Sequence, residues 1–187
     1  VVEYFRITNL VLKEDYAKIV DMEAVAEESY DAMEAYMLAR ERANDKLLAA
    51  SKMVEREQHA FAASNNIKLI ESENALDKKM EVAGKVYDTY NEIYLIFFKS
   101  FKQEVYLMDA ISRKDINGIE QNRNALVAAA KEGLKKLEAV KPYANDKSMV
   151  EATKKLLNFY IDEAENEIPK MSDYFMKSEN MEKVKKA

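Results

Sequence analysis

Few residues in this sequence are of the types that carry out catalysis, and their spacing argues against a catalytic or metal site. There is one histidine, His59, and no cysteine. A ferritin-like di-metal centre needs a Glu-x-x-His pair on each of two helices, whereas the acidic residues nearest to His59 are Glu55 and Glu57. A Ser-His-Asp triad would use the same histidine and lacks a Gly-x-Ser-x-Gly elbow to present its serine. We therefore predict that the protein is not an enzyme and has no catalytic residue, metal ligand or cofactor.

Three glycines stand apart from one another, at positions 84, 118 and 133. Neither a P-loop nor a dinucleotide-binding fingerprint is present, because each of these motifs needs glycines gathered in one loop. We expect the three glycines to serve close helix packing or local backbone freedom instead.

The most distinctive feature is a group of aromatic residues, namely Tyr87, Tyr90, Tyr94, Phe97, Phe98, Phe101 and Tyr106. Rings at spacings of three and four are typical of the core of a thick helical bundle, and core packing is the first interpretation. A small-ligand slot is the alternative, because a tyrosine can hydrogen-bond a buried polar ligand while its ring packs against it. The residues that would line such a slot are Tyr87, Tyr90, Tyr94 and Phe98.

The composition predicts an all-α protein and excludes an all-β sandwich or a Rossmann fold. Among 187 residues there are three glycines and two prolines, so the residues that break helices and allow tight turns are rare. The net charge is −5, whereas nucleic-acid binders show a basic balance or stripe, so we expect no nucleic-acid partner. The longest unbroken apolar run, Ile93 to Phe98, is far short of the roughly 20 residues of a membrane-spanning helix, so we expect no transmembrane segment.

Apolar periodicity and turn residues divide the chain into five predicted helices. They cover residues 1–20, 22–64, 72–112, 116–140 and 148–176. Asp21 and Asp115 are predicted N-caps of the helices that follow them, and Ser148 with Glu151 resembles a capping box. Pro169 lies within the last helix, where it removes a backbone donor and should produce a kink.

The predicted architecture is an antiparallel up-down helical bundle from about residue 22 to 176, with long helices of about 40 residues. The first tight hairpin is expected at residues 62–66, where Ala-Ala-Ser-Asn-Asn tolerates turn geometry. A comparison of the chain with itself indicates a tandem repeat, since residues 1–5 match residues 156–160 apolar against apolar, and residues 19–20 match 174–175 at the same offset.

Two parts of the chain resemble a known family. Residues 57–62 (Glu-Gln-His-Ala-Phe-Ala) followed by residues 65–69 (Asn-Asn-Ile-Lys-Leu) resemble the closing helix of a family of bacterial cell-surface or lipoprotein-type four-helix bundles, first named from a leptospiral surface protein and common in Bacteroidota. Residues 157–160 (Leu-Asn-Phe-Tyr) and 163–167 (Glu-Ala-Glu-Asn-Glu) are similar to its third helix, and residues 141–148 to the loop that precedes it.

The resemblance implies a four-helix fold arranged in tandem units. Residues 1–70 would be the C-terminal half of one unit, with a short helix and a long helix over 22–64, and residues 71–187 the first three helices of a second, related unit. The two parts could also pack as one bundle. The resemblance further implies a location in the bacterial cell envelope, in the periplasm or on the outer surface, and no reaction. The sequence departs from the family in having no lipobox cysteine.

The leading functional prediction is a non-enzymatic helical-bundle protein of the bacterial cell envelope or surface that acts as a scaffold or protein-interaction module, and a protein partner is therefore expected. The alternative is a small-ligand carrier with an aromatic-lined cavity inside the bundle. A metal-dependent enzyme is a third hypothesis, for which no motif with a mechanism is present.

Overall fold

The computed structural model describes residues 1–70 and 75–186. Within these residues every regular element is a helix, which confirms the all-α prediction. The chain forms two compact units, Val1–Glu81 and Val82–Ala187. None of the helices in the described part is long and apolar enough to cross a membrane.

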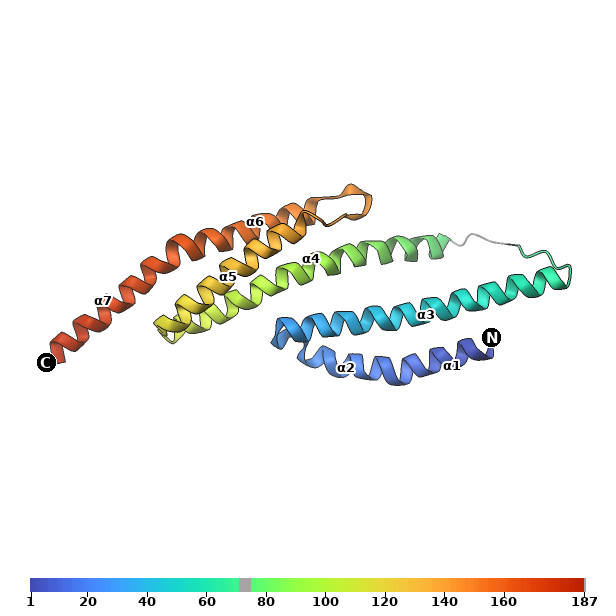
Figure 1. Cartoon of the computed structure of the whole chain (residues 1–187), viewed down its shortest axis with the longest axis horizontal. Helices are drawn as coiled ribbons and strands as arrows, with labels where there is room; N and C mark the ends of the chain where they lie inside the picture. The colour runs from blue at the N-terminus through green and yellow to red at the C-terminus, as the bar shows by residue number, and fades with distance from the viewer. Residues whose placement is uncertain (71–74, 187) are drawn as a thin grey trace. The chain divides into compact units, whose positions relative to one another are not determined.

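The first unit is a hairpin of two helical rods that run in opposite directions (Figure 1). One rod consists of α1 (Val2–Leu10), a π-helical turn (Val11–Asp15) and α2 (Tyr16–Val25), and the other rod is α3 (Tyr30–Ser64). The rods are joined by an ion pair of 2.8 Å between Asp15 and Lys46. Their buried cluster consists of Val11, Ile19 and Ala43.

The turn between these two rods corrects one prediction. The sequence predicts an unbroken helix over residues 22–64 with Asp21 as its N-cap, but Asp21 lies inside α2 and the helix is interrupted at residues 26–29. The hydroxyl of Ser29 caps α3, because it accepts the N–H of Ala32 at 3.1 Å. Ala26 is 2% exposed at the turn. The first chain reversal therefore lies at residues 26–29 and not at the predicted hairpin of residues 62–66.

The C-terminal end of α3 lies where small residues and asparagines were expected to end a helix. Helix α3 ends at Ser64, and Asn66 has a φ of 53°, in the left-handed region that asparagine tolerates. The side chain of Asn65 donates to the carbonyl oxygen of Phe61 at 2.8 Å. The predicted start of the next helix at Ser72 lies outside the described residues.

The second unit contains the part of α4 from Val82 onward and three further helices. The bounds are α4 (Ala75–Ser112), α5 (Ile116–Leu137), α6 (Ser148–Asp162) and α7 (Ile168–Lys186), with a 3-10 turn at Tyr143–Asn145 and a π-helical turn at Glu163–Glu167. In Figure 1, α5 returns along α4, and α6 returns along α5. The two longest helices, α3 and α4, have 35 and 38 residues. The described core of the second unit consists of Ile93, Leu107, Ala110, Ile119, Leu126, Ala130, Leu137, Val140, Val150, Leu157, Tyr160, Ala164 and Ile168.

One of the two predicted N-terminal caps in this unit is confirmed and one is wrong. The carboxylate of Asp115 caps α5, as predicted, by accepting the N–H of Gly118 at 3.0 Å. No capping box forms at Ser148 and Glu151, since Ser148 is already the first residue of α6. Its N–H donates to the carboxylate of Asp146 at 2.9 Å. The hydrogen bonds from Ser148 lower the pKa of Asp146.

The three glycines have different surroundings. A Cβ at Gly133 would lie 2.8 Å from Leu157 Cδ1 and 3.2 Å from Ile96 Cγ2, so α5 packs closely against side chains of α6 and α4 at this glycine. A Cβ at Gly118 would lie 2.6 Å from the capping carboxylate of Asp115. Nothing lies within 4 Å of the Cβ position of Gly84. The packing prediction is therefore confirmed at Gly133 and not at Gly84.

A π-helical turn occurs in each unit and keeps the buried face of its rod in line. Residues eight apart in a regular α-helix differ by about 80° in direction, and a π-helical turn, which bonds i to i+5, takes up an additional residue. Val11 and Ile19 are eight residues apart and are 1% and 5% exposed. Ala164 and Ser172 have the same spacing in the second unit and are 0% and 3% exposed.

Pro169 is the second residue of α7, and Ile168 alone separates it from the π-helical turn Glu163–Glu167. A proline has no N–H to bond the carbonyl four residues earlier, and its ring would clash with that carbonyl. The wider turn accommodates the proline without ending the helix. Figure 1 shows the rod bending where α6 passes into α7.

Candidate functional site

Helix α4 has two apolar faces within the second unit. On one face Ile93, Leu107 and Ala110 are at most 2% exposed and belong to the core of the unit. On the other face lie six rings, which we call the aromatic stripe: Tyr87, Tyr90, Tyr94, Phe97, Phe98 and Phe101. The described core cluster contains none of these six residues.

The two faces of α4 point in different directions. Successive residues of an α-helix differ by about 100°, so the mean direction of the stripe is about 140° away from that of the core residues of α4. The rings therefore lie beside the described core cluster and not within it. Core packing, the first interpretation of their spacing, agrees with the burial of Phe98, which is 2% exposed, and stays a prediction for the other rings.

The rings of the aromatic stripe stack on one another along the helix. The ring centroids of Tyr90 and Tyr94 are 5.8 Å apart, and those of Tyr94 and Phe98 are 5.7 Å apart. Phe97 and Phe101 stack with their centroids 5.6 Å apart. Contacts of this kind contribute about 0.5–1.5 kcal/mol each beyond area burial. Five of the six rings are thus held in place by neighbouring rings.

Exposure changes along the aromatic stripe. Tyr87 and Tyr90, at its N-terminal end, are 65% and 44% exposed, whereas Phe98 is 2% exposed. Tyr94 and the other two phenylalanines are half-buried. Of the four residues predicted to bind a ligand, the structure brings Tyr90, Tyr94 and Phe98 into one stack and places Tyr87 about one turn before Tyr90. All four lie on one helix, and their role in ligand binding stays a prediction.

An open groove lies on the side of α4 opposite the aromatic stripe. Its volume is about 350 Å³, and its lining residues are Lys85, Asp88, Thr89, Glu92, Lys141 and Tyr143. The first four are spaced i, i+3, i+4 and i+7, which puts them on one face of the helix. The other two come from the connection between α5 and α6. The sequence did not predict this groove, and the polar spacing over residues 85–92 was a signal for four of its six lining residues.

The groove combines two ammonium groups, two carboxylates, a hydroxyl and a phenol. The Thr89 hydroxyl donates to the carbonyl oxygen of Lys85 at 3.2 Å, so its proton is used within the helix. In the adjoining connection, Ala144 and Asn145 both have positive φ values, of 52° and 58°. The groove therefore offers charges of both signs on a surface that is largely open to solvent.

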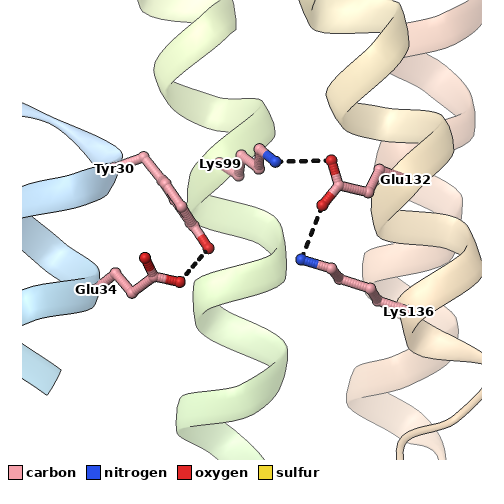
Figure 2. Close-up of polar contacts among 5 residues, drawn as sticks. All are labelled: Tyr30, Glu34, Lys99, Glu132 and Lys136. Carbon is pink, nitrogen blue, oxygen red and sulfur yellow. Dashed lines mark hydrogen bonds and ion pairs between the residues drawn. The ribbon is translucent and has the colours of Figure 1, made fainter. Parts of the chain in front are cut away.

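Charged side chains elsewhere in the second unit are paired across helices. Figure 2 shows Glu132 of α5 accepting hydrogen bonds from Lys99 of α4 at 2.7 Å and from Lys136 at 2.8 Å. The hydrogen bonds from Lys136 and Lys99 lower the pKa of Glu132 to about 2.

In the first unit, Figure 2 shows the hydroxyl of Tyr30 donating to Glu34 at 2.8 Å. These pairs hold charges in place and present no reacting group.

A second polar pair lies within the core of the second unit. The hydroxyl of Tyr160 in α6 donates to the carboxylate of Glu104 in α4 at 2.6 Å. Tyr160 is 5% exposed, and burial together with the hydrogen bond to Glu104 raises its pKa above the ordinary value. The phenol therefore stays protonated and acts as a donor that joins two helices.

The single histidine has no metal-binding neighbours. His59 is exposed on α3. Among the residues that the structure describes, there is no group of three His, Cys, Asp or Glu side chains that could hold a metal ion.

The fold and the stripe define an all-α protein of two compact helical units, one of which carries a stripe of rings beside its described core cluster. Comparison of the chain with known protein families, with curated proteins and with solved structures finds no match. The family resemblance seen in the sequence therefore stays a prediction, and the function is argued from the geometry.

Proposed function

We propose that the protein is a non-enzymatic helical-bundle protein of the bacterial cell envelope, and that it acts as a scaffold by binding another protein through the aromatic stripe. The observation that carries this proposal is a stripe of six rings on α4, five of them stacked, that lies outside the described core cluster and ends in the exposed Tyr87 and Tyr90. Tyrosine and phenylalanine are enriched at protein interfaces, where few large anchors supply most of the binding energy.

The exposed end of the stripe has the chemistry of an interface anchor. Tyr87 and Tyr90 combine an apolar ring with a hydroxyl, and 65% and 44% of their surfaces are open to solvent. A tyrosine can bury a large area at a low entropic cost, because it has two side-chain torsions. The six residues of the stripe are tyrosines and phenylalanines, so the stripe lacks the lysine and arginine side chains that bind anionic substrates or nucleic acids.

The finer architecture is part of the proposal. We infer an antiparallel up-down bundle of long helices, built from two related units of a tandem array. The two π-helical turns support a relation between the rods, since the buried pair Val11 and Ile19 corresponds to Ala164 and Ser172. That correspondence has an offset of 153 residues, two fewer than the offset of the sequence match.

Location in the envelope rests on the family resemblance alone. Fractionation of the native cells, with detection of the protein in the cytoplasmic, periplasmic and membrane fractions, tests it directly. Recovery of the protein with the cytoplasmic markers would reject this part of the proposal and leave the binding role of the stripe standing.

Site-specific photo-cross-linking in the native cells tests the binding role. A photoreactive phenylalanine analogue at position 87 should give a defined cross-linked protein. The same analogue at Tyr174 of α7, which is 69% exposed, serves as the matched control and should not give that product. Identical products at both positions, or none at position 87, would reject the stripe as the binding surface.

A small-ligand carrier is the second candidate function, and the groove of about 350 Å³ favours it. Native mass spectrometry of protein purified gently from its source should then show a stoichiometric small-molecule adduct. Loss of the adduct in Lys141→Ala would assign it to the groove, and loss in Tyr90→Phe with Tyr94→Phe would assign it to the stripe. Protein without any adduct would reject the carrier.

A further inference from the structure

We propose that two copies of this chain associate through an apolar stripe on the first helical rod, so that the first rods of the two copies lie against each other. The stripe consists of Val1, Phe5, Leu12 and Val20, and we call it the outer stripe. It belongs to the first unit and shares no residue with the aromatic stripe of α4, so this pairing is separate from the proposed function. Its exposure, its lack of charge and its area carry the inference.

The outer stripe lies on a side of the first rod that α3 does not cover. Val11 and Ile19, which belong to the buried cluster shared with α3, are 1% and 5% exposed. Successive residues of an α-helix differ by about 100° in direction, so the first three residues of the stripe lie about 80–120° to one side of Val11. Val20 lies about 100° to the same side of Ile19. The four residues therefore form one line along the rod.

The side chains of the outer stripe are open to solvent from one end of the rod to the other. Val1, Phe5, Leu12 and Val20 are 70%, 64%, 56% and 63% exposed. Helix α1 contains no buried residue. A helix normally buries an apolar face against another element. The first rod thus has a second apolar face, which the described part of the chain leaves open.

No charged side chain lies on the outer stripe. Residues 1–20 carry six charged side chains. Asp15 is paired with Lys46 of α3 at 2.8 Å, and Glu3 is paired with Arg6 at 2.6 Å. By the same spacing of about 100°, all six point outside the sector of the stripe. Like charges that face each other oppose the association of identical surfaces, and the outer stripe brings none together.

The charge balance of the rod favours a second copy over a membrane surface. Helices that lie on membranes carry an excess of lysine and arginine on the polar face, which is attracted to anionic lipids. Residues 1–20 have three acidic and three basic side chains and therefore no such excess. The stripe runs along about 30 Å of helix. An identical stripe matches it in length and in chemistry.

The outer stripe has the area that a specific dimer needs. At roughly 200 Å² for each large apolar residue, its four members expose about 500 Å². Patches of about this size on a monomer often mark binding sites. Two copies bring together about 1,000 Å² of apolar surface, and apolar atoms make up roughly 57% of an interface, so the dimer would bury about 1,700 Å² in all. Specific, stable interfaces bury about 1,200–2,000 Å².

Sedimentation equilibrium of the full chain over a range of concentrations tests the pairing. The unaltered protein should dimerise, and the double variant Phe5→Glu with Leu12→Glu should weaken the dimer at least about tenfold, as the loss of two anchors does. Both side chains are exposed, so helix content by circular dichroism should not change. The matched control is Leu156→Glu with Phe159→Glu in α6, where the side chains are 36% and 54% exposed. It should dimerise like the unaltered protein.

Cross-linking through single thiols gives a second test that does not depend on the glutamate variants. The chain has no cysteine, so Leu12→Cys places one thiol near the middle of the outer stripe. A short bis-maleimide should then link two copies, as electrophoresis under denaturing conditions shows. Lys18→Cys, on another side of the rod, is the control and should stay at the mass of one chain. Equal linkage at both positions, or a dimer that survives the double glutamate variant, would overturn the inference.

The remaining outcomes identify a different occupant of the outer stripe. A chain that stays monomeric at all concentrations overturns the pairing. If that chain binds vesicles of phosphatidylcholine and phosphatidylglycerol, and Phe5→Glu with Leu12→Glu abolishes the binding, the stripe contacts a membrane instead. The same double variant should leave the cross-link from position 87 unchanged, because the aromatic stripe lies in the other unit. The pairing and the proposed function can therefore fail separately.

Discussion

The carboxylate of Glu132 lies between two ammonium groups, so its ionised form is favoured in the folded protein. Its pKa is lowered from 4.5 to about 2 by hydrogen bonds from Lys136 and Lys99. A lowered folded-state pKa contributes stability that is present above the unfolded value and is lost as the pH falls toward the folded value. Because the side chain is 42% exposed, solvent screening limits the contribution to about 0.5 kcal/mol.

We therefore expect the free energy of unfolding of the unaltered protein to exceed that of Glu132→Gln at neutral pH. The difference should shrink as the pH falls from about 4.5 to about 2. Urea unfolding at a series of pH values, under reversible conditions, measures it. A difference that stays constant over this range would show that the ionisation of Glu132 is not linked to folding.

Gly133 is the residue at which an added methyl group has the least room. The Cβ of Gly133→Ala would lie 2.8 Å from Leu157 Cδ1, so the buried Leu157 side chain must shift or α5 and α6 must move apart, at a cost of about 1–3 kcal/mol. Gly84→Ala is the matched control, since it meets no atom and should stabilise by about 0.5–1 kcal/mol. Urea unfolding compares the two, and equal effects of the two substitutions would contradict the packing argument.

Single residues were predictable from sequence where a local rule applies. Asp115 caps α5 because a short acidic side chain before a helix reaches the N–H groups of its first turn. The same rule failed at Ser148, because Asp146 lies two residues earlier and competes for the same role. Asp146 and Ser148 are both possible hydrogen-bond acceptors at the N-terminal end of α6. The sequence does not show which of the two side chains the backbone places close to the free N–H groups.

Among the elements, α4 shows why the site was only partly predictable. Its apolar residues include both the core side chains, such as Ile93 and Leu107, and the aromatic stripe. A periodicity of three and four identifies a helix with buried residues but does not tell which of two apolar faces the rest of the unit covers. The sequence predicted the members of the stripe but could not show that Ile93 and Leu107 belong to the core cluster while Tyr87 and Tyr90 are exposed.

The break at residues 26–29 was missed for a related reason. Ala26, Glu27 and Glu28 are good helix formers, so no local signal interrupts the predicted helix. The interruption depends on the packing of Ala26 and on the cap at Ser29, which arise when the two rods meet. Tertiary contacts therefore override propensity at this point.

The π-helical turn Glu163–Glu167 leads to a prediction at the same scale. Deleting the exposed Asn166 would leave Ala164 and Ser172 seven residues apart, which in a regular α-helix differ by only about 20° in direction. Ser172, 3% exposed, would then stay in the core, so the deletion should be tolerated. Deleting Glu165 as well would rotate α7 by about a further 100° and take Ser172 out of the core, at a cost of about 3 kcal/mol or more. Thermal unfolding followed by circular dichroism should show a large loss for the double deletion alone, and equal melting of the two variants would refute the alignment role of the turn.

At the scale of the whole molecule, the two units differ in how much core they have. The first unit has a buried cluster of Val11, Ile19 and Ala43, whereas the cluster of the second unit is larger and draws on α4, α5, α6 and the start of α7. Local stability follows the number of buried apolar contacts. The all-α class was predictable from composition, but this inequality was not, because the helix-forming residues are spread evenly along the chain.

Hydrogen exchange measured by mass spectrometry on the intact chain tests the inequality. Amides of α1, α2 and α3 should exchange faster than those of α5 and α6, and urea should unfold the first unit at a lower concentration. Peptides from the loop over residues 138–147 give an internal reference for rapid exchange. Equal protection of both units, with one shared transition, would contradict unequal cores.

The hydrogen bond between Tyr160 and Glu104 makes the stability of the fold depend on pH in alkaline solution. An unfolded tyrosine loses its proton near pH ~10, whereas burial and Glu104 raise the pKa of Tyr160 in the folded state. The pair stabilises the fold below that pH, and the contribution is lost as the pH rises further. In a spectrophotometric titration of the eleven tyrosines, Tyr160 should ionise late and together with loss of helix, whereas Tyr160→Phe should remove that late step. The ultraviolet absorbance of a phenolate would then report the unfolding of the molecule through a single proton.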